Sequence, residues 1–362
     1  MIDTQMRSEN AQSKAALSAL SPERFGFRTH RHGWLLDFPS IGPVAFARLA
    51  WPHAQVPSFS VVAGEDEATN ALGLLVPLQQ QVWGFPPAEA VPVNILSILE
   101  DTGGAVIVAY DLEVGFNSTG WLGFAIGMGT RTGVLYSHML GVREDVRGLN
   151  DLGWCLKILQ GYLAVLSGHH AMTWTYDPLR GANARLNLEK LGASMVNLTV
   201  DKYGVMRSTL YGDVPTDRFT AYWNLLDPAM HRRVEAVRGG HYQPLLPDQV
   251  MHIPEATAEN VVRVLRDMPE QVRYCIPGDI DALMQSAPDE AVQWRQGVRD
   301  VLGRLMTLRK ANIDEDTLSE GPISVDAGIT TGAYDVTGFA THKALGTDER
   351  TSFYILSRKS ES

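Results

Sequence analysis

The clearest change of hydrophobic pattern in the chain falls between residues 134 and 167. An apolar run from Val134 to Val142 predicts a β-strand. A polar segment, 143–151, follows and carries Arg147 and Gly148. From Leu152 onward the apolar residues recur at every third or fourth position, which predicts a helix. The pattern therefore predicts a strand, a polar turn and a helix in immediate succession.

A turn that leads into a helix in this way is suited to holding a phosphate. The first N–H groups of a helix lack intrahelical partners, the helix dipole favours negative charge there, and glycine lets the backbone come close. The chain has no G-x-x-x-x-G-K-[ST] and no G-x-G-x-x-G followed by a spaced acidic residue, so two common phosphate loops are excluded. The alternative is an ordinary strand–turn–helix capped by Asn150 or Asp151.

A second strand and helix follow directly. Met172 to Tyr176 predicts a strand that Asp177-Pro178 ends, and Asn183 to Leu191 predicts a short helix. Gly192 is well placed as its C-cap. Upstream, 105–110 and 121–128 predict antiparallel strands that form a meander with 134–142, and the helix from Leu152 should make a right-handed crossover to the next strand.

These residues resemble the GNAT superfamily of acyl-CoA-dependent N-acyltransferases, and within it a bacterial branch with a long C-terminal extension. Motif A of that family, (Arg/Gln)-x-x-Gly-x-(Gly/Ala), is matched by Arg147, Gly148 and Gly153, although Asn150 stands where a glycine is usual and the loop is one residue longer. The later family helix, N-x-x-A-x-x-L-Y-x-K-x-G-F, is matched by Ala184, Lys190 and Gly192. The resemblance covers about residues 60–219.

The resemblance implies an α/β (α+β) fold, with a mixed, mainly antiparallel twisted sheet flanked by helices. It implies acetyl-CoA or another acyl-CoA as co-substrate and a small amine or amino acid as acceptor, with no metal. Coenzyme A would be bound by the end of the strand and by the turn: Leu140, Gly141, Val142, Arg147, Gly148, Leu149, Asn150, Asp151, Leu152 and Gly153. His169-His170 has no third ligand at metal spacing.

The candidates for catalysis follow from the same comparison. His138 is the candidate base, because an imidazole needs little change in pKa to work near neutral pH; Glu100 and Asp101 are alternatives. Leu188 replaces the tyrosine that protonates the thiolate in many family members, so Tyr176 and Tyr203 are the candidate acids.

For the acceptor, Trp83 and Phe85 are candidate pocket walls, and Asp177 and Arg180 are candidate contacts. Each has a structural alternative. The aromatic residues would pack under a loop, Asp177 would cap the next helix, and the arginine would be solvated.

Composition narrows the class of protein further. The 362 residues are 45% hydrophobic and 20% charged, as expected of a globular protein with full cores. A net charge of −10 argues against nucleic acid as a partner. The polar N-terminus and the lack of any 18-residue apolar window predict a cytoplasmic protein that neither enters nor spans a membrane. Homo-oligomer formation is left open.

The length predicts two domains. We expect a frayed segment at 1–22, a strand-rich addition at 23–56, an acyl-CoA-binding domain at 57–220 and a smaller α+β domain at 221–362. The element order of the last segment suggests a partial GNAT copy, completed by the strands of 24–51. Two functional alternatives stand beside acyl transfer: a GNAT-derived binding or structural protein that has lost catalysis, and a protein that binds another nucleotide at the same turn.

Overall fold

The computed structural model describes residues 2–31, 33–49, 71–84, 86–148, 151–204, 216–310, 329–343 and 350–360. These residues form two compact units. The first comprises 1–174 and 223–239, and the second comprises 175–222 and 240–362. The start of the expected acyl-CoA-binding domain, 57–70, and the site residues Phe85, Leu149 and Asn150 lie outside the described residues.

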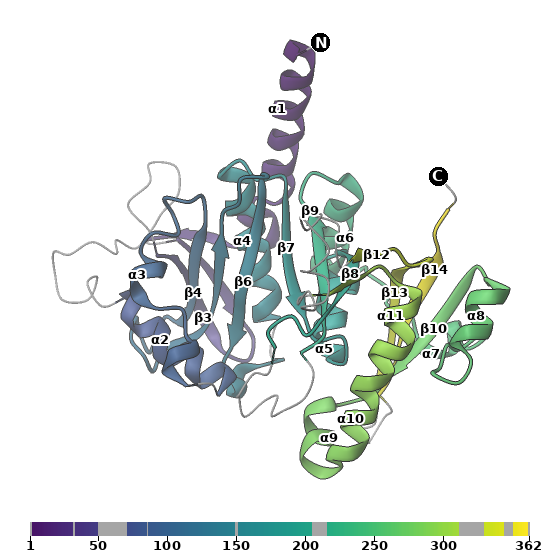
Figure 1. Ribbon diagram of the computed structural model, residues 1–362. Helices are drawn as coiled ribbons and strands as arrows, with labels where there is room; N and C mark the ends of the chain where they lie inside the picture. The colour runs from purple at the N-terminus through teal and green to yellow at the C-terminus, as the bar shows by residue number, and fades with distance from the viewer. Residues whose placement is uncertain are drawn as a thin grey trace, which may run out of the picture. The chain divides into compact units, whose positions relative to one another are not determined.

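The first unit contains a mainly antiparallel sheet in chain order (Figure 1). Its strands are β1 Arg28–His30, β2 Gly33–Phe38, β3 Gly42–Arg48, β4 Ala105–Asp111, β5 Trp121–Met128, β6 Val134–Val142 and the start of β7 Ala171–Tyr176. Each neighbour is antiparallel except β7, which runs parallel to β6. The mixed, helix-flanked sheet expected from the sequence is confirmed.

Helices cover both faces of this sheet. One face packs on α2 Ala71–Trp83 and α3 Val93–Leu96 through a buried apolar cluster that includes Leu75, Phe124 and Ile126. Because side chains alternate along a strand, Gly123 and Gly127 of β5 face the other side, against α4 Leu152–Leu166. The predicted helix from Leu152 is confirmed.

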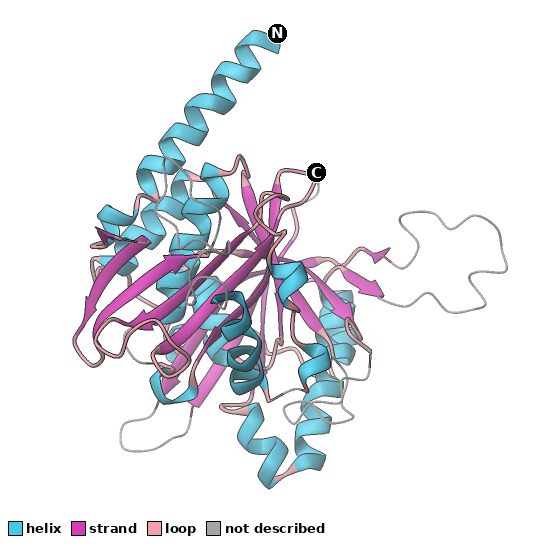
Figure 2. Cartoon of the chain, turned by 90° about the vertical axis from the view of Figure 1, so that its left-hand side faces the viewer, coloured by secondary structure: helices cyan, strands magenta, loops and turns pink. Residues whose placement is uncertain are grey.

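Helix α4 is apolar on nearly all sides because it is covered on its outer side as well. There it packs on α1 Ile2–Ala19, which itself contacts α6 Pro228–Arg238. The N-terminus predicted to be frayed is therefore a helix, seen projecting upward in Figure 2. Its C-terminal end is held by the burial of Ala16 and Leu20, a tertiary effect that its polar sequence does not reveal.

The early strands belong to the first unit. Val44 to Arg48 of β3 pair with Ile107 to Asp111 of β4. The hypothesis that these strands complete the second domain is therefore wrong. The apolar side chains of β3, including the fully buried Val44 and Phe46, are covered within the first unit.

The second unit is also a mixed α+β structure. Its strands β8 Ser194–Val200, β9 Arg218–Asn224, β10 Gln271–Ile276, β13 Tyr334–Lys343 and β14 Arg350–Arg358 pair antiparallel in the order β9-β8-β13-β14-β10. Two short strands, β11 Leu308–Lys310 and β12 Ile329–Thr330, pair with each other, and β11 also runs parallel to β8.

The helices of the second unit are mostly short. They are α5 Gly181–Ala184, the π-helix η5 Arg185–Lys190, α7 Pro247–Val250, α8 Val261–Asp267, α9 Ile280–Ser286, α10 Pro288–Gly297, the π-helix η6 Val298–Leu302 and α11 Gly303–Leu305. Pro288 begins α10 directly after α9 ends, because proline is accepted at the first turn of a new helix. Aromatic contacts among Tyr176, Phe219 and Tyr354 lie in the core of this unit.

Candidate functional site

Strands β6 and β7 pair over only a short distance. Val134, Leu135 and Tyr136 pair with Ala171, Met172 and Thr173, and within the described residues the parallel ladder ends there. Strand β6 continues for six more residues, to Val142, and this stretch pairs with β5 on its other side. Among the described residues, the edge of β6 beyond Tyr136 has no strand partner on the β7 side, which leaves backbone groups for another ligand.

His138 lies where this open edge begins. Ile126 of β5 pairs with Met139 and Gly127 pairs with Ser137, so His138 is the extra residue of a β-bulge. A bulge changes the direction of its side chain relative to a regular strand. Burial lowers the pKa of His138 below its ordinary value, so the imidazole is neutral near pH 7.

The turn after β6 is held by an arginine that the sequence analysis did not select. Arg143 donates from Nη1 to the carbonyl oxygens of Thr119 (2.6 Å) and Trp121 (3.2 Å), and its guanidinium also pairs with Asp145. These contacts tie the turn to the β4–β5 connection. Both partners are distant in sequence, so only the strand pairing could have identified Arg143.

The turn then leads through Gly148 toward the N-terminus of α4. Gly148 has a φ of 79°, a conformation that favours glycine, and nothing lies within 4 Å of where a Cβ would be. The side chain of Asp151 makes no capping hydrogen bond, and the carbonyl of Asp151 accepts from Cys155. Among the described residues, no group accepts a hydrogen bond from the N–H groups of Leu152 or Gly153. These donors at a helix N-terminus suit an anion.

The other predicted coenzyme-binding residues lie at the same corner. Arg147 is exposed, and its Nη2 lies 3.4 Å from the carbonyl oxygen of Val142. Leu140 and Val142 of β6 pack against the start of α4. A Cβ added at Gly153 of α4 would lie 3.6 Å from Leu140 and 3.8 Å from Val142. The structure therefore brings together the described members of the predicted set.

Trp83 borders this corner from the opposite face of β6. A Cβ on Gly141 would lie only 2.8 Å from both Trp83 Cη2 and Val82 Cγ1, so only glycine allows α2 to pack this closely. The Trp83 ring also packs edge-on against Phe124, with centroids 5.4 Å apart. Trp83 is thus partly buried and packs against the core, as its structural alternative predicts.

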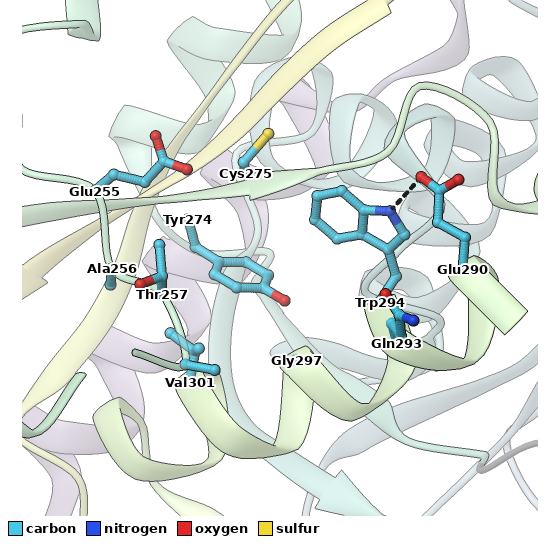
Figure 3. A pocket seen from close by; sticks show the side chains of 11 residues that line it. Glu255, Ala256, Thr257, Tyr274, Cys275, Glu290, Gln293, Trp294, Gly297 and Val301 are labelled. Carbon is cyan, nitrogen blue, oxygen red and sulfur yellow. Dashed lines mark hydrogen bonds between the residues drawn. The ribbon is translucent and has the colours of Figure 1, made fainter. Parts of the chain in front are cut away.

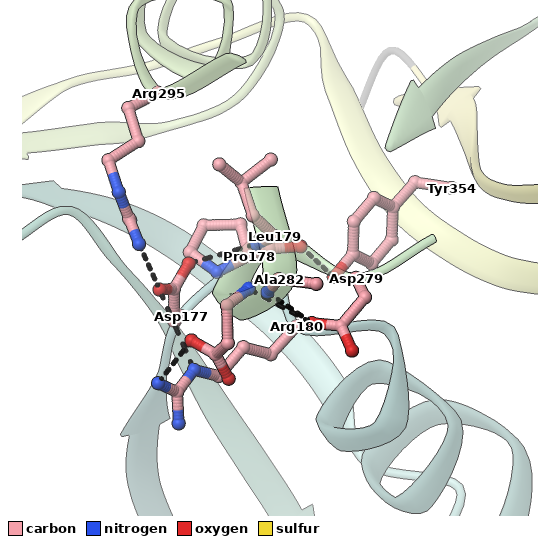
Figure 4. Close-up of polar contacts among 9 residues, drawn as sticks. Asp177, Pro178, Leu179, Arg180, Asp279, Ala282, Arg295 and Tyr354 are labelled. Carbon is pink, nitrogen blue, oxygen red and sulfur yellow. Dashed lines mark hydrogen bonds and ion pairs between the residues drawn. The ribbon is translucent and has the colours of Figure 1, made fainter. Parts of the chain in front are cut away.

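The candidate acceptor residue Asp177 is buried in the second unit (Figure 4). Its side chain is only 1% exposed; Oδ1 accepts from the Leu179 N–H, and Oδ2 lies 3.0 Å from Nη2 of Arg295. Arg180 pairs with Asp281 at 2.8 Å. Asp177 does not cap α5, whose N-cap residue is Arg180, and Arg180 is ion-paired rather than solvated. Both charges are thus already paired within the protein.

The two candidate acids also belong to the second unit. Burial raises the pKa of Tyr176, so this phenol stays protonated, but its side chain is enclosed. Tyr203 is exposed, and its hydroxyl lies 2.9 Å from Oγ1 of Thr175. Leu188, which cannot serve as the acid, is buried. Of the alternative bases, Glu100 forms an ion pair with Arg48.

A buried lysine lies beside the open edge of β6. Lys157 of α4 is 3% exposed; its Nζ donates to Ser137 Oγ at 2.6 Å and lies 3.7 Å from the centre of the Trp174 ring. The ring favours the ammonium form, whereas burial favours the neutral amine. Burial prevails and lowers the pKa of Lys157 well below that of an exposed lysine, because no carboxylate pairs with it among the described residues.

We expect Lys157→Met to raise the free energy of unfolding at pH 7 by about 1–2 kcal/mol, since it removes a buried ionisable group. The unfolded chain binds more protons than the folded one between the lowered pKa and about 10.5. The stability of the natural protein should therefore rise with pH across that window, and the variant should lack this rise. Urea unfolding at pH 7 and pH 9.5 measures both effects.

Lys14→Met is the matched control, because Lys14 is exposed on α1 of the same unit. Its effect should stay within about 0.5 kcal/mol. A Lys157→Met variant that is less stable than the natural protein at both pH values would contradict the expectation.

No family model matches the chain, and no curated protein matches it either. Solved structures do match. A putative GNAT-family acetyltransferase from Desulfovibrio desulfuricans is 18% identical, with a TM-score of 0.34, and the match covers 50% of this chain and 99% of that one. A putative acetyltransferase from Salmonella typhimurium, solved with its cofactor acetyl-CoA, is 16% identical with a TM-score of 0.33, over 46% and 93%.

The ribosomal-protein-S18-alanine N-acetyltransferase from Escherichia coli is 12% identical, with a TM-score of 0.36, and the match covers 50% of this chain and 94% of that one. At these identities and TM-scores the neighbours carry no argument about this chain's activity or fold. The meander of β4, β5 and β6, the parallel step to β7 through α4, and the parting of β6 from β7 define the first unit on their own. This order of elements agrees with the fold that the sequence resemblance implies.

The described ranges also bear on membrane spans and metal sites. None of the helices there combines the length and the hydrophobicity needed to span a bilayer. The same ranges hold no group of three or more His, Cys, Asp or Glu side chains placed to bind a metal ion.

Proposed function

We propose that the protein is an acyl-CoA-dependent N-acyltransferase whose active centre lies at the corner between β6 and α4. One observation supports the proposal: among the described residues, the edge of β6 after Tyr136 has no ladder with β7, and this edge lies at the same corner as Gly148 and the N-terminal N–H groups of α4. A thioester arm and a diphosphate need these two kinds of backbone site side by side. An ordinary strand–turn–helix would need neither.

The residues present fit the coenzyme. The N–H groups at the start of α4, with Gly148 and Arg147, would bind the diphosphate by charge-assisted hydrogen bonds worth about 1.5–3 kcal/mol each. Such local contacts are needed because the net charge of −10 repels a polyanion. The open edge of β6 at residues 139–142 would hold the thioester carbonyl oxygen by backbone N–H groups.

In the proposed reaction, the amine nitrogen attacks the thioester carbonyl carbon, the C–N bond forms and the C–S bond breaks. Neutral His138 takes the proton that the amine loses, and the thiolate departs and is protonated by solvent or a nearby acid. Holding the two reactants in contact supplies most of the rate. An acetyl or succinyl donor and an amine or amino-acid acceptor are the partners that the family resemblance suggests.

A second candidate function is a GNAT-derived protein that binds coenzyme A without catalysis. The buried Leu188 at the usual tyrosine position favours it, because an aliphatic side chain cannot protonate the thiolate. Turnover separates the two candidates. Release of free coenzyme A in the presence of amines and amino acids supports the transferase, and binding without any release supports the alternative.

We expect Gly148→Glu to weaken coenzyme A binding at least tenfold, about 1.4 kcal/mol, because it adds a negative charge where the diphosphate would lie. Calorimetry with acetyl-CoA, succinyl-CoA and free coenzyme A measures this against a micromolar affinity expected for the natural protein. Competition by ATP but not by coenzyme A would instead indicate a different nucleotide.

Gly240→Glu is the matched control. Gly240 has a φ of 69°, also lacks any atom within 4 Å of a Cβ, and is exposed. The backbone strain and the charge change are therefore the same, and affinity should stay within twofold. If none of the three coenzyme A species binds the natural protein, the proposed function fails.

A further inference from the structure

The second unit contains a pocket that acyl transfer does not use (Figure 3). It has a volume of about 440 Å³ and lies between β10, the segment 255–258 and the helical run of α10 and η6. A volume of this size falls within the range of small-molecule sites, about 300–1,000 Å³. All of its lining residues belong to the second unit.

One helix face forms a wall of this pocket. Glu290, Trp294, Gly297 and Val301 recur at helical spacing, and Tyr274 of β10 faces them. A Cβ on Gly297 would lie 3.0 Å from Tyr274 Oη. The missing side chain at this position therefore keeps the phenol accessible from the pocket.

The polar groups of the pocket point to the charge of its ligand. Glu290 lies at the end of the wall, with Trp294 Nε1 3.5 Å from its Oε1, and among the described residues no cation pairs with it. The other carboxylate, Glu255, is already paired with Arg273 at 2.9 Å. The uncompensated charge lining the pocket is thus negative.

The surroundings of Tyr274 agree with that sign. Burial raises the pKa of Tyr274, and the negative charge of Asp300 raises it further. The Tyr274 hydroxyl has no hydrogen-bond partner among the described residues. The pocket therefore combines a free phenol, an indole ring and a carboxylate.

We propose that this pocket binds an organic cation, an amine whose ammonium group lies against Glu290 and whose apolar body lies between Trp294 and Tyr274. A cation is attracted both by the carboxylate and by the face of an indole ring. An anion would be repelled by Glu290, and a purely apolar ligand would cover the carboxylate without compensating it. This binding site is independent of the proposed acyl transfer.

The test uses the full-length protein and three probes of similar shape: 2-phenylethylamine, 2-phenylethanol and 3-phenylpropionate. Ligand-observed NMR and calorimetry should show saturable binding of the amine, at least tenfold weaker binding of the alcohol and no binding of the carboxylate. Equal affinity for amine and alcohol, or no binding of the amine, would overturn the proposal.

Two variants locate the binding. Glu290→Gln should weaken amine binding about tenfold and leave alcohol binding unchanged, because it removes only the charge. Gly297→Leu should abolish amine binding by filling the space in front of Tyr274. Since Glu290 is exposed, its variant should fold even if Gly297→Leu does not.

Asp289→Asn is the matched control, because Asp289 is an exposed acid on the same helix and does not line the pocket. It should change amine affinity less than twofold. Amine binding that survives Glu290→Gln unchanged would show that the pocket is not the site. Calorimetry of the Glu290→Gln variant with coenzyme A should match the natural protein, so failure here and failure of the proposed function are distinguishable.

Discussion

Replacing His138 with alanine is expected to lower kcat for acyl transfer by about 10²–10⁴-fold, the usual contribution of a positioned general base. The KM for the acyl-CoA should stay within about threefold, since the bulge at His138 precedes the turn that would bind the diphosphate. Stopped assays of coenzyme A release, with the amine that the natural protein acylates fastest, measure both constants.

The pH dependence gives a second, independent readout. Burial lowers the pKa of His138 below about 6.5, so the neutral base persists as the solution becomes more acidic. The acid limb of kcat/KM should therefore have its midpoint below pH 6.5, and this limb should vanish in His138→Ala. His170→Ala is the control, because His170 is an exposed histidine of the same unit. Unchanged kcat in His138→Ala would assign the base elsewhere.

Arg295→Met is expected to destabilise the protein by about 3–5 kcal/mol, because it removes the closer charge partner of the buried Asp177 carboxylate and leaves only Arg180, whose Nε lies 4.0 Å away. The side chains of Arg295 and Asp177 are only 4% and 1% exposed, and their closest atoms are 3.0 Å apart (Figure 4). A carboxylate enclosed in this way cannot regain water. Urea unfolding at pH 7 measures the loss.

Two further variants test whether the lost stability comes from the Arg295–Asp177 ion pair. Arg304→Met makes the same change at an exposed position on the adjoining α11 and should alter stability by no more than about 0.5 kcal/mol. The double variant Arg295→Met/Asp177→Leu should recover part of the stability, because it removes the stranded charge as well. Recovery should be incomplete, since the Leu179 N–H would lose its acceptor. A single Arg295→Met variant as stable as the natural protein would contradict this role.

The outcome for Asp177 shows why its role was hard to predict. Its place before a short helix suggested either an acceptor contact or a cap, and both readings used only neighbouring residues. The partner that decides its role, Arg295, lies 118 residues away in the sequence. An isolated arginine in a helical run carries no sign of being buried, because most arginines are solvated.

The same distinction holds across the candidate site. Local periodicity alone determined the strand at 134–142 and the helix from Leu152, because the spacing of apolar residues in each segment shows which face it buries. The glycine turn between them was also visible in the sequence. Only the tertiary structure decided that β6 and β7 part after Tyr136, that a bulge falls at His138, and that Arg143 ties the turn to the β4–β5 connection. These features depend on the register between strands, which is set by partners distant in the chain rather than by neighbours.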